Sequence, residues 1–546
     1  MTPSNLALTR RGDPLVLTPS RTPPATPQVI IPPFGPRIVT GMLGVLIAVM
    51  MSGINDHVTD IDMMDIGGGF LFGHDEAAWM RALFQAGQVI GMAFAPWCAV
   101  TFSLRRFCLV MTALLAVLGL VSPFAPNVEA LYALRISQGL VGGFLPPLLI
   151  TVALRYCPPH IRLFGFAGYA LSSTFGPNMA TPLAAWWSDY VGWRWIFWQI
   201  IPFCLVSLAA VAHGLPQDPL RLERFKRFDW GGLLTGAPSL SALVIAAHQG
   251  DRLNWFASPL FCFLLIGGGL LFCVFLLNEW VHPAPIFNLK ILARRNFLHS
   301  SVSIAVLLIV YLGAIIVPLT FLGEMKGHRA LQSVPLALII ALPQLLLLPL
   351  VSALLNIERV DSRWVFCLGL CLIAYSCHLG SFITTAWEPR DFYLLLALQA
   401  VGQPMTILPV LMVVVADMPP DDGPHISAMF NATKGFAAVL ITTFVEGIGR
   451  YRTGVHSSVL VGRLGQEPTA VQNRLAALGQ HQGDEGVRAD LSLERLAHQV
   501  HAQSFTLAMA DIYRLLVILT LALVVLTLVL PTRVRPPRAV TPPAAR

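Results

Sequence analysis

The sequence has few charged residues. They make up 12% of its 546 residues, whereas a soluble domain usually carries about 25%. Hydrophobic residues make up 55% and gather in long runs. So little charge cannot cover the surface of a water-soluble protein of this size, and the apolar runs exclude a disordered chain. The composition therefore indicates a membrane protein that crosses the bilayer many times.

The sequence also lacks the motifs of the commonest nucleotide-driven and hydrolytic sites. No GxxxxGK[ST] loop, HExxH pair or GxSxG turn occurs. The nine cysteines lie in or beside apolar runs and give neither a disulfide framework nor a zinc spacing. We therefore expect no enzyme, no metal and no cofactor, but either transport driven by an ion gradient or a passive conduit. The net charge of +7 reflects basic connections between spans rather than nucleic-acid binding.

Each membrane-crossing helix needs about 20 apolar residues. Fourteen such runs are predicted, at 38–57, 78–99, 107–124, 130–152, 164–186, 195–213, 230–248, 257–279, 298–320, 333–355, 364–385, 392–415, 428–448 and 511–530. An even number places both termini on one side of the membrane. Arg and Lys are concentrated in the connections on that side, which predicts cytoplasmic termini.

Two terminal segments lie outside the runs. Residues 1–37 are rich in proline and lack an uninterrupted apolar stretch, so we expect a flexible cytoplasmic tail rather than a signal peptide. Residues 531–546 are expected to form a second cytoplasmic tail.

Segment 449–510 is the only sizeable polar part of the chain. It follows the thirteenth run and therefore lies on the side opposite the termini. Pro468 can begin a helix that Gly479 would end, and Asp490 can cap a second helix that continues towards Ala510.

Charged residues inside the runs are the strongest functional signal, because a charge at the centre of a span costs about 2.5–3.5 kcal/mol. Asp56 and Asp60 are the deepest acids at the end of the first run, although a solvated loop is the alternative for both. Arg135 lies inside the fourth run and shares a helix face with Gln138. Arg135 could extend to the membrane surface, but we favour an interior position because Gln138 makes the same face polar.

Other polar or aromatic residues inside the runs are candidates for a substrate cavity. They are Phe84, Gln85, Gln88, Gln138, Gln344, Gln399, Gln403 and Lys434. A single glutamine in a span more often forms a hydrogen bond between helices than it binds substrate, so that alternative stays open. Glu446, near the end of the thirteenth run, is the next candidate for a proton carrier. In the fifth run, Gly176 and Pro177 predict a bend and a close helix contact.

Three motifs carry a family resemblance. Arg135-Ile136-Ser137-Gln138-Gly139 resembles RxxQG, Gly176-Pro177 resembles the start of GPxxGG, and Trp193-Arg194-Trp195-Ile196-Phe197 resembles WRWIF. In this order, with fourteen runs, the sequence resembles the fourteen-span drug:proton antiporters (EmrB/QacA type) of the major facilitator superfamily. It departs from their pattern at Ala180-Thr181, where the glycine pair of GPxxGG would stand. It also departs at 97–106, where the acidic residue of the family's loop motif is missing.

The resemblance implies an all-α major facilitator fold. Its parts would be a six-helix bundle at 38–213, a linker with two inserted helices at 214–297, and a second six-helix bundle at 298–530 that includes 449–510. The two bundles would rock around a midplane cavity. Because Asp56 and Asp60 are the acids nearest the membrane interior in the first bundle, we expect them to couple protons to transport, with Arg135 as a nearby charge of opposite sign that pairs with a buried acid.

The function implied is proton-coupled efflux of amphipathic drug-like or toxic molecules across a bacterial inner membrane. The alternatives are an importer, an exporter of a specific metabolite, lipid or siderophore, and a membrane receptor or enzyme that works through 449–510. Resembling exporters of two-membrane bacteria pass substrate to a periplasmic adaptor and an outer-membrane channel. Segment 449–510 could dock such an adaptor, or its helices could simply pack over the cavity mouth. The candidate docking residues are Leu475, Ala476, Leu478, Leu491, Leu493 and Leu496.

Overall fold

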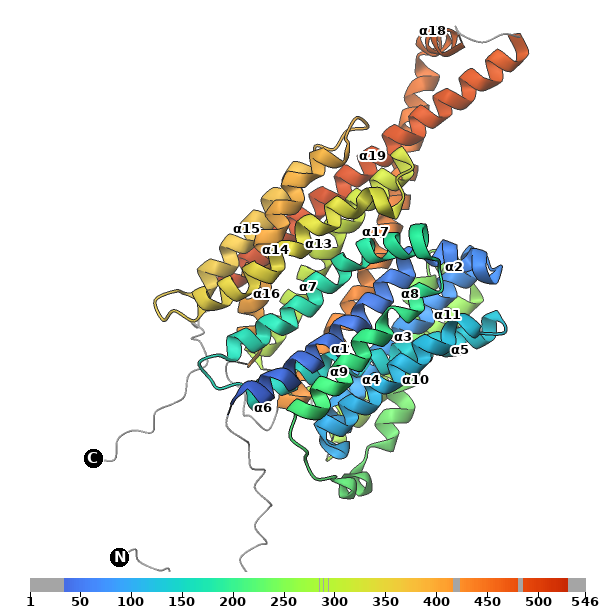
Figure 1. Cartoon of the computed structure of the whole chain (residues 1–546). Helices are drawn as coiled ribbons and strands as arrows, with labels where there is room; N and C mark the ends of the chain where they lie inside the picture. Colours follow the sequence, from blue (N-terminus) through green and yellow to red (C-terminus); the bar gives the residue numbers. More distant parts are fainter. Residues whose placement is uncertain are drawn as a thin grey trace, which may run out of the picture. The chain divides into compact units, whose positions relative to one another are not determined.

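The computed structural model describes residues 34–528, except 284, 288, 293, 416–422 and 480–484 (Figure 1). The predicted tail 531–546 and residues 1–33 of the predicted tail 1–37 therefore lie outside the described part of the chain.

Within those residues every regular element is a helix. The first part of the chain forms α1 (Pro36–Ile61), α2 (Met63–Phe70), α3 (His74–Phe102), α4 (Leu104–Val121), α5 (Val128–Gly143), α6 (Pro146–Tyr156), α7 (Arg162–Trp186), α8 (Trp195–Trp198) and α9 (Ile200–Gly214). It continues with α10 (Trp230–Gln249), α11 (Pro259–Val281), α12 (Leu289–Leu292), α13 (Arg295–Lys326), α14 (Ala330–Leu355), α15 (Ser362–Gly380), α16 (Tyr393–Val415), α17 (Gly423–Gln466), α18 (Pro468–Gly479) and α19 (Glu485–Leu528).

Thirteen helices in the described part are long and apolar enough to cross a membrane. The remaining predicted run, 164–186, falls on α7, a 25-residue helix that is less apolar because it carries Ser172, Ser173, Thr174 and Asn178. The all-α polytopic fold is thus confirmed, whereas the count of fourteen spans stays a prediction.

Following the predicted division, we call α1–α9 the first bundle, α13–α19 the second bundle, and α10 with α11 the inserted pair. In the first bundle, α1 packs on α7 and α9, and α3 packs on α5. In the second, α13 packs on α16, α17 and α19, and α15 packs on α16 and α19. Contacts of α7 with α14 and of α3 with α17 join the two bundles, and α10 packs on both α3 and α17.

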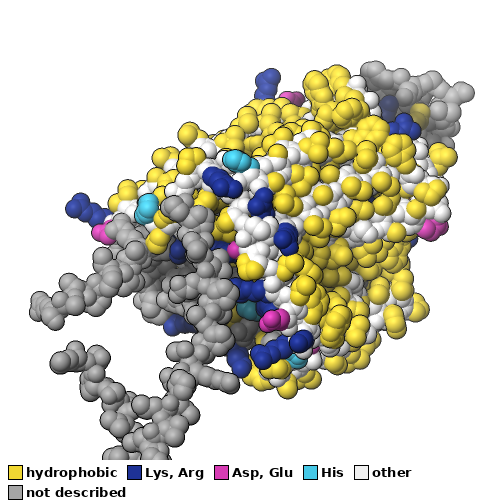
Figure 2. Space-filling view, turned by 60° about the horizontal axis from the view of Figure 1, so that its bottom comes forward, with side chains coloured by type: hydrophobic (Ala, Val, Ile, Leu, Met, Phe, Trp, Pro, Cys, Tyr) yellow, Lys and Arg dark blue, Asp and Glu magenta, His cyan; other side chains and the backbone are white. Residues whose placement is uncertain are grey.

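The surface suits a lipid environment. Figure 2 shows hydrophobic side chains over most of the visible surface, with Lys and Arg gathered in one region of it. The most apolar helix, α11, exposes Phe263, Leu270, Leu277 and Val281, which soluble proteins rarely do over a whole helix. This is a multi-pass membrane protein.

The sequence interpretation of 449–510 needs one correction. Helices α17 and α19 each contain 44 residues, which corresponds to about 66 Å, about twice the thickness of the bilayer core. The last two predicted spans therefore continue into the polar segment as unbroken helices. The predicted helix from Pro468 to Gly479 is confirmed as α18. Asp490 lies within α19 and does not begin it.

Ion pairs at one end of the helices join the bundles to each other and to the inserted pair. These pairs are Arg252–Asp75 (Nε–Oδ1 2.8 Å), Asp251–Arg450 and Arg329–Asp189 (Nη1–Oδ1 3.9 Å). At the other end, Ser427 Oγ donates to the carbonyl oxygen of Pro147 at 2.7 Å, and Asn356 Nδ2 donates to that of His160 at 3.1 Å. Contacts between the bundles are therefore present at both ends.

Candidate proton and substrate site

A buried carboxylate lies inside the first bundle. Asp56 on α1 is only 4% exposed. Its Oδ2 atom accepts hydrogen bonds from Gln85 Nε2 at 3.0 Å and Gln88 Nε2 at 3.5 Å, both on α3. The neighbouring Asn55 is fully buried, and its side-chain amide has no hydrogen-bond partner among the described residues. Asp56 therefore lies in the protein interior and not in a solvated loop.

Arg135 on α5 is also fully buried, which excludes the alternative that it extends to the membrane surface. Its Nη1 atom donates to Gln138 Oε1 at 3.2 Å and to Thr59 Oγ1 at 3.5 Å. Its guanidinium carbon lies 4.3 Å from the centre of the Phe84 ring, a cation–π distance. These direct partners are neutral, so the expectation of a direct pair between Arg135 and a buried acid is not met among the described residues.

Glycines set the position of this site. On α5, an ideal Cβ at Gly139 would lie 2.0 Å from the carbonyl oxygen of Phe84, and one at Gly143 would lie 2.1 Å from that of Gln88. On α3, Gly87 and Gly91 would clash in the same way at 2.3 Å. Since no real Cβ tolerates such distances, α3 and α5 can cross this closely only because these positions are glycine. The crossing brings Phe84 beside Arg135.

The second predicted acid has a different partner. Asp60 Oδ1 lies 3.3 Å from Arg81 Nε on α3. Arg81 Nη1 also lies 3.9 Å from Glu446 Oε1 on α17. Asp60, Arg81 and Glu446 therefore form a chain of charges that runs from the first bundle to the second.

The predicted glutamines of the second bundle are packed between its helices. Gln344 Nε2 donates to the carbonyl oxygen of Ala400 at 2.9 Å, which joins α14 to α16. Gln399 Nε2 donates to Ser376 Oγ at 3.4 Å, which joins α16 to α15. Gln403 is 1% exposed. These contacts match the alternative of hydrogen bonds between helices, and the structure does not bring these residues to Asp56.

Gly176 and Pro177 lie inside an unbroken α7. An ideal Cβ at Gly176 would meet Ile54 at 3.9 Å, an ordinary contact, so the close approach expected there is not present in this conformation. A role for the two residues in transport stays a prediction.

Residues 37–442 match the family model of the Major Facilitator Superfamily. The chain is a member of that superfamily. The resemblance inferred from its motifs is confirmed, and the superfamily is one of transporters.

This superfamily member has curated relatives that match over most of their length. The multidrug export protein EmrB of Escherichia coli K12 is 22% identical over 461 residues, which cover 82% of this chain and 88% of EmrB. The colistin resistance protein EmrB of Acinetobacter baumannii is 20% identical over 485 residues (87% and 93%). The fatty acid resistance protein FarB of Neisseria gonorrhoeae is 23% identical over 503 residues (89% and 94%).

Solved structures share the fold of this transporter. The human organic anion transporter MFSD10 (TETRAN) has a TM-score of 0.52 at 11% identity, with 89% of this chain and 100% of that chain covered. A double Trp mutant of XylE has a TM-score of 0.50 at 15% identity, with 89% and 96% covered.

The transporter has further polar contacts between its bundles that the sequence reasoning missed. The Tyr169 hydroxyl on α7 donates to Asn431 Oδ1 on α17 at 2.8 Å. Lys434, one turn further along α17, donates from Nζ to Ser173 Oγ on α7 at 2.6 Å. The sequence did contain a signal for these contacts, because Asn431 and Lys434 are three residues apart in the thirteenth run and so lie on one helix face.

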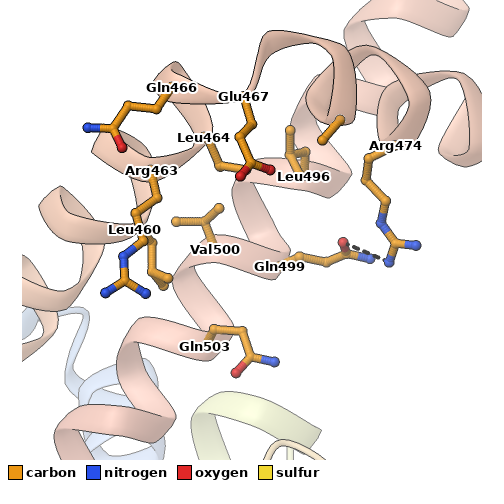
Figure 3. A pocket seen from close by; sticks show the side chains of 11 residues that line it. Leu460, Arg463, Leu464, Gln466, Glu467, Arg474, Leu496, Gln499, Val500 and Gln503 are labelled. Atoms are coloured by element: carbon orange, nitrogen blue, oxygen red, sulfur yellow. Dashed lines mark hydrogen bonds between the residues drawn. The ribbon is translucent and has the colours of Figure 1, made fainter.

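A hollow of about 630 Å³ lies where α17, α18 and α19 meet, in the part that extends beyond the predicted spans. Figure 3 shows aliphatic side chains on its inner side and charged or amide side chains around them. Arg474 Nη2 donates to Gln499 Oε1 at 3.2 Å across the hollow. The hollow is lined by Leu460, Arg463, Leu464, Gln466, Glu467, Ala470, Arg474, Leu496, Gln499, Val500 and Gln503.

The predicted docking residues differ in their exposure. Leu496 lines the hollow, Leu475 and Leu491 are half-buried, and Ala476 and Leu493 are exposed. The Leu478 side chain lies outside the described part of the chain.

Proposed function

We propose that this transporter exports amphipathic drug-like or toxic molecules in exchange for protons, by alternating access between its two bundles. The observation that carries the proposal is Asp56, a titratable group buried inside the first bundle and held by two amides of α3. The full-length similarity to proteins named for multidrug export supports the choice of substrates.

Asp56 suits the role of proton carrier because its charge depends on its surroundings. A buried carboxylate is tolerated when it is protonated, or when donors and a nearby cation stabilise the anion. Gln85 and Gln88 supply the donors, and Arg135 on α5 is the cation inside the same bundle. Movement of α1 relative to α3 would change this balance, so that a proton binds on one side and leaves on the other. Each entering proton supplies about 2.3 kcal/mol per 100 mV of membrane potential.

Alternating access would use the contacts at the two ends in turn. Opening at the α18 end would separate Arg81 from Glu446 and break the ion pairs of the inserted pair. Opening at the other end would break the bonds of Ser427 and Asn356. Since both sets connect the same two bundles, a rocking motion that lengthens one set keeps the other in place.

We place the protein in the bacterial inner membrane, with both termini cytoplasmic. The ends of α17 and α19 and the whole of α18 would then lie in the periplasm, where an adaptor and an outer-membrane channel could receive the substrate. Crosslinkers at Leu475 and Leu496 should capture a periplasmic protein in native cells. Capture of the transporter alone, with resistance retained after replacement of 467–484 by a short loop, would remove the docking role and leave antiport intact.

The deciding experiment is substrate-dependent proton flux in proteoliposomes, screened over compound classes that include drugs, lipids, siderophores and metabolites. We expect amphipathic drug-like compounds to release protons from the lumen only when the transporter is present. Flux with a single metabolite, lipid or siderophore class would select the specific exporter instead. If no compound moves protons although the protein is folded and correctly inserted, the antiport proposal is wrong.

A further inference from the structure

Lys434 lies at a contact between three helices from both bundles. Its Nζ atom donates to Ser173 Oγ at 2.6 Å and lies 5.1 Å from the centre of the Tyr169 ring, both on α7. The next residue, Gly435, packs on α3, since an ideal Cβ there would lie 3.1 Å from Val89 and 3.2 Å from Met92. Lys434 is therefore half-buried where α17 meets α7, one residue from the contact of α17 with α3.

The charge of Lys434 has no protein counter-ion in the described part of the chain. Two other cations have one, since Arg81 pairs with Asp60 and Arg155 pairs with Asp218, whereas the direct partners of Arg135 are neutral. For Lys434, the contacts are a hydroxyl and an aromatic face, and no carboxylate of a described residue lies within 4.0 Å of its Nζ atom. An ammonium has three N–H donors, of which Ser173 takes one. A half-buried cation between helices is costly unless a negative charge meets it.

Aromatic and aliphatic side chains lie near this ammonium. The Tyr169 ring lies 6.3 Å from the Phe430 ring, and Val89 and Met92 of α3 pack on the adjacent Gly435. An unpaired cation beside aromatic and aliphatic surface is complementary to a molecule with one anionic group on an apolar body.

We propose that Lys434 binds the anionic group of the exported compound, and that amphipathic organic anions are the preferred substrates. The proposal rests on the proposed export function and names its substrate class. Two donors of Lys434 are available to a carboxylate or sulfonate, while the rings and Met92 contact the apolar part. The ammonium lies between helices of both bundles, so a bound anion would be held where the bundles move apart.

The test uses one apolar body with and without its charge. The full-length protein, purified in a neutral detergent, is titrated with a dansyl-labelled alkyl carboxylate and with its methyl ester, and binding is followed by dansyl fluorescence. We expect the wild-type chain to bind the carboxylate at least tenfold more tightly than the ester. Lys434→Gln should lose about tenfold for the carboxylate and little for the ester, and Lys434→Arg should keep most of the preference.

Thr433→Val is the matched control. Thr433 lies beside Lys434 on α17, and its hydroxyl donates within the helix to the carbonyl oxygen of Met429 at 2.9 Å, so this variant should bind both probes as the wild type does. Thermal melting of every variant checks folding. Equal binding of both probes by the wild type, or no binding of the carboxylate, would overturn the proposal. So would an equal loss of both probes in a folded Lys434→Gln variant, which would assign Lys434 a structural role. Binding needs no proton gradient, so a failure of antiport and a failure of anion recognition are seen separately.

Discussion

Replacement of Gly139 by alanine should disrupt the centre of the first bundle although it adds a single methyl group. That methyl carbon would lie 2.0 Å from the Phe84 carbonyl oxygen, where an ordinary contact begins at 3.4 Å. Both helices would have to separate by about 1.4 Å, and such overpacking usually costs about 1–3 kcal/mol. The obstacle is backbone, so no side-chain rotation can relieve it.

The direction of the stability change distinguishes a clash from a tolerated substitution. In a helix, alanine is intrinsically better than glycine by about 1 kcal/mol, so a substitution without a clash should be neutral or stabilising. Gly53→Ala is such a control, because no atom lies within 4 Å of its ideal Cβ. Gly176→Ala is a second, with its nearest contact at 3.9 Å.

The assay is thermal unfolding of the purified variants in one detergent, together with transport in proteoliposomes. We expect Gly139→Ala to melt at a lower temperature than the wild type and to lose most transport, because Phe84 moves away from Arg135. Gly53→Ala should melt at the wild-type temperature or above it. A Gly139→Ala variant as stable as the two controls and as active as Gly53→Ala would refute the close crossing of α3 and α5.

Three further predictions concern charged groups. Asp56→Asn should abolish substrate-dependent proton flux in proteoliposomes while the variant stays folded, and normal flux would move the proton carrier to Asp60 or Glu446. Arg135→Lys should lose at least tenfold in transport rate, because a lysine cannot contact Gln138, Thr59 and the Phe84 face together; wild-type rates would contradict this. Burial raises the pKa of Asp62, between α1 and α2, to about 7. This carboxyl therefore favours folding less as the pH rises from about 4 to about 7. The Asp62→Asn variant should match the melting temperature of the wild type at pH 4 and exceed it at pH 8. A difference in melting temperature that is the same at both pH values would contradict the raised pKa.

The interior position of Arg135 could be predicted from the sequence, because Gln138 follows it by one helical turn and both are too polar for lipid. Its partners could not, since they depend on how α1, α3 and α5 are rotated against one another. The close crossing of α3 and α5 did leave a signal, as glycines stand four residues apart on both helices, at 87 and 91 and at 139 and 143.

The ends of α17 and α19 were missed for a different reason. A hydropathy pattern reports where the chain leaves the apolar part of the bilayer, not where the backbone stops being helical. Arg452 and His456 lie beyond the thirteenth apolar run, yet they join α17 to α19, because Arg452 forms an ion pair with Asp511 and His456 Nε2 lies 2.7 Å from Asp511 Oδ2. The helix therefore continues where the hydrophobic signal stops.

The loop of the inserted pair limits how the bundles can part. Asp251 and Arg252 are consecutive residues, yet Asp251 pairs with Arg450 of the second bundle and Arg252 with Asp75 of the first. Asp251 and Arg252 are joined by one peptide bond, which cannot stretch. At least one of their two ion pairs must therefore break whenever the bundles separate at this end. Each of the two ion pairs includes a largely exposed side chain, and dissolved salt weakens exposed ion pairs. In the proposed alternating-access cycle, the two ion pairs of this loop would therefore oppose opening at this end, and their effect would fall as the ionic strength of the surrounding medium rises.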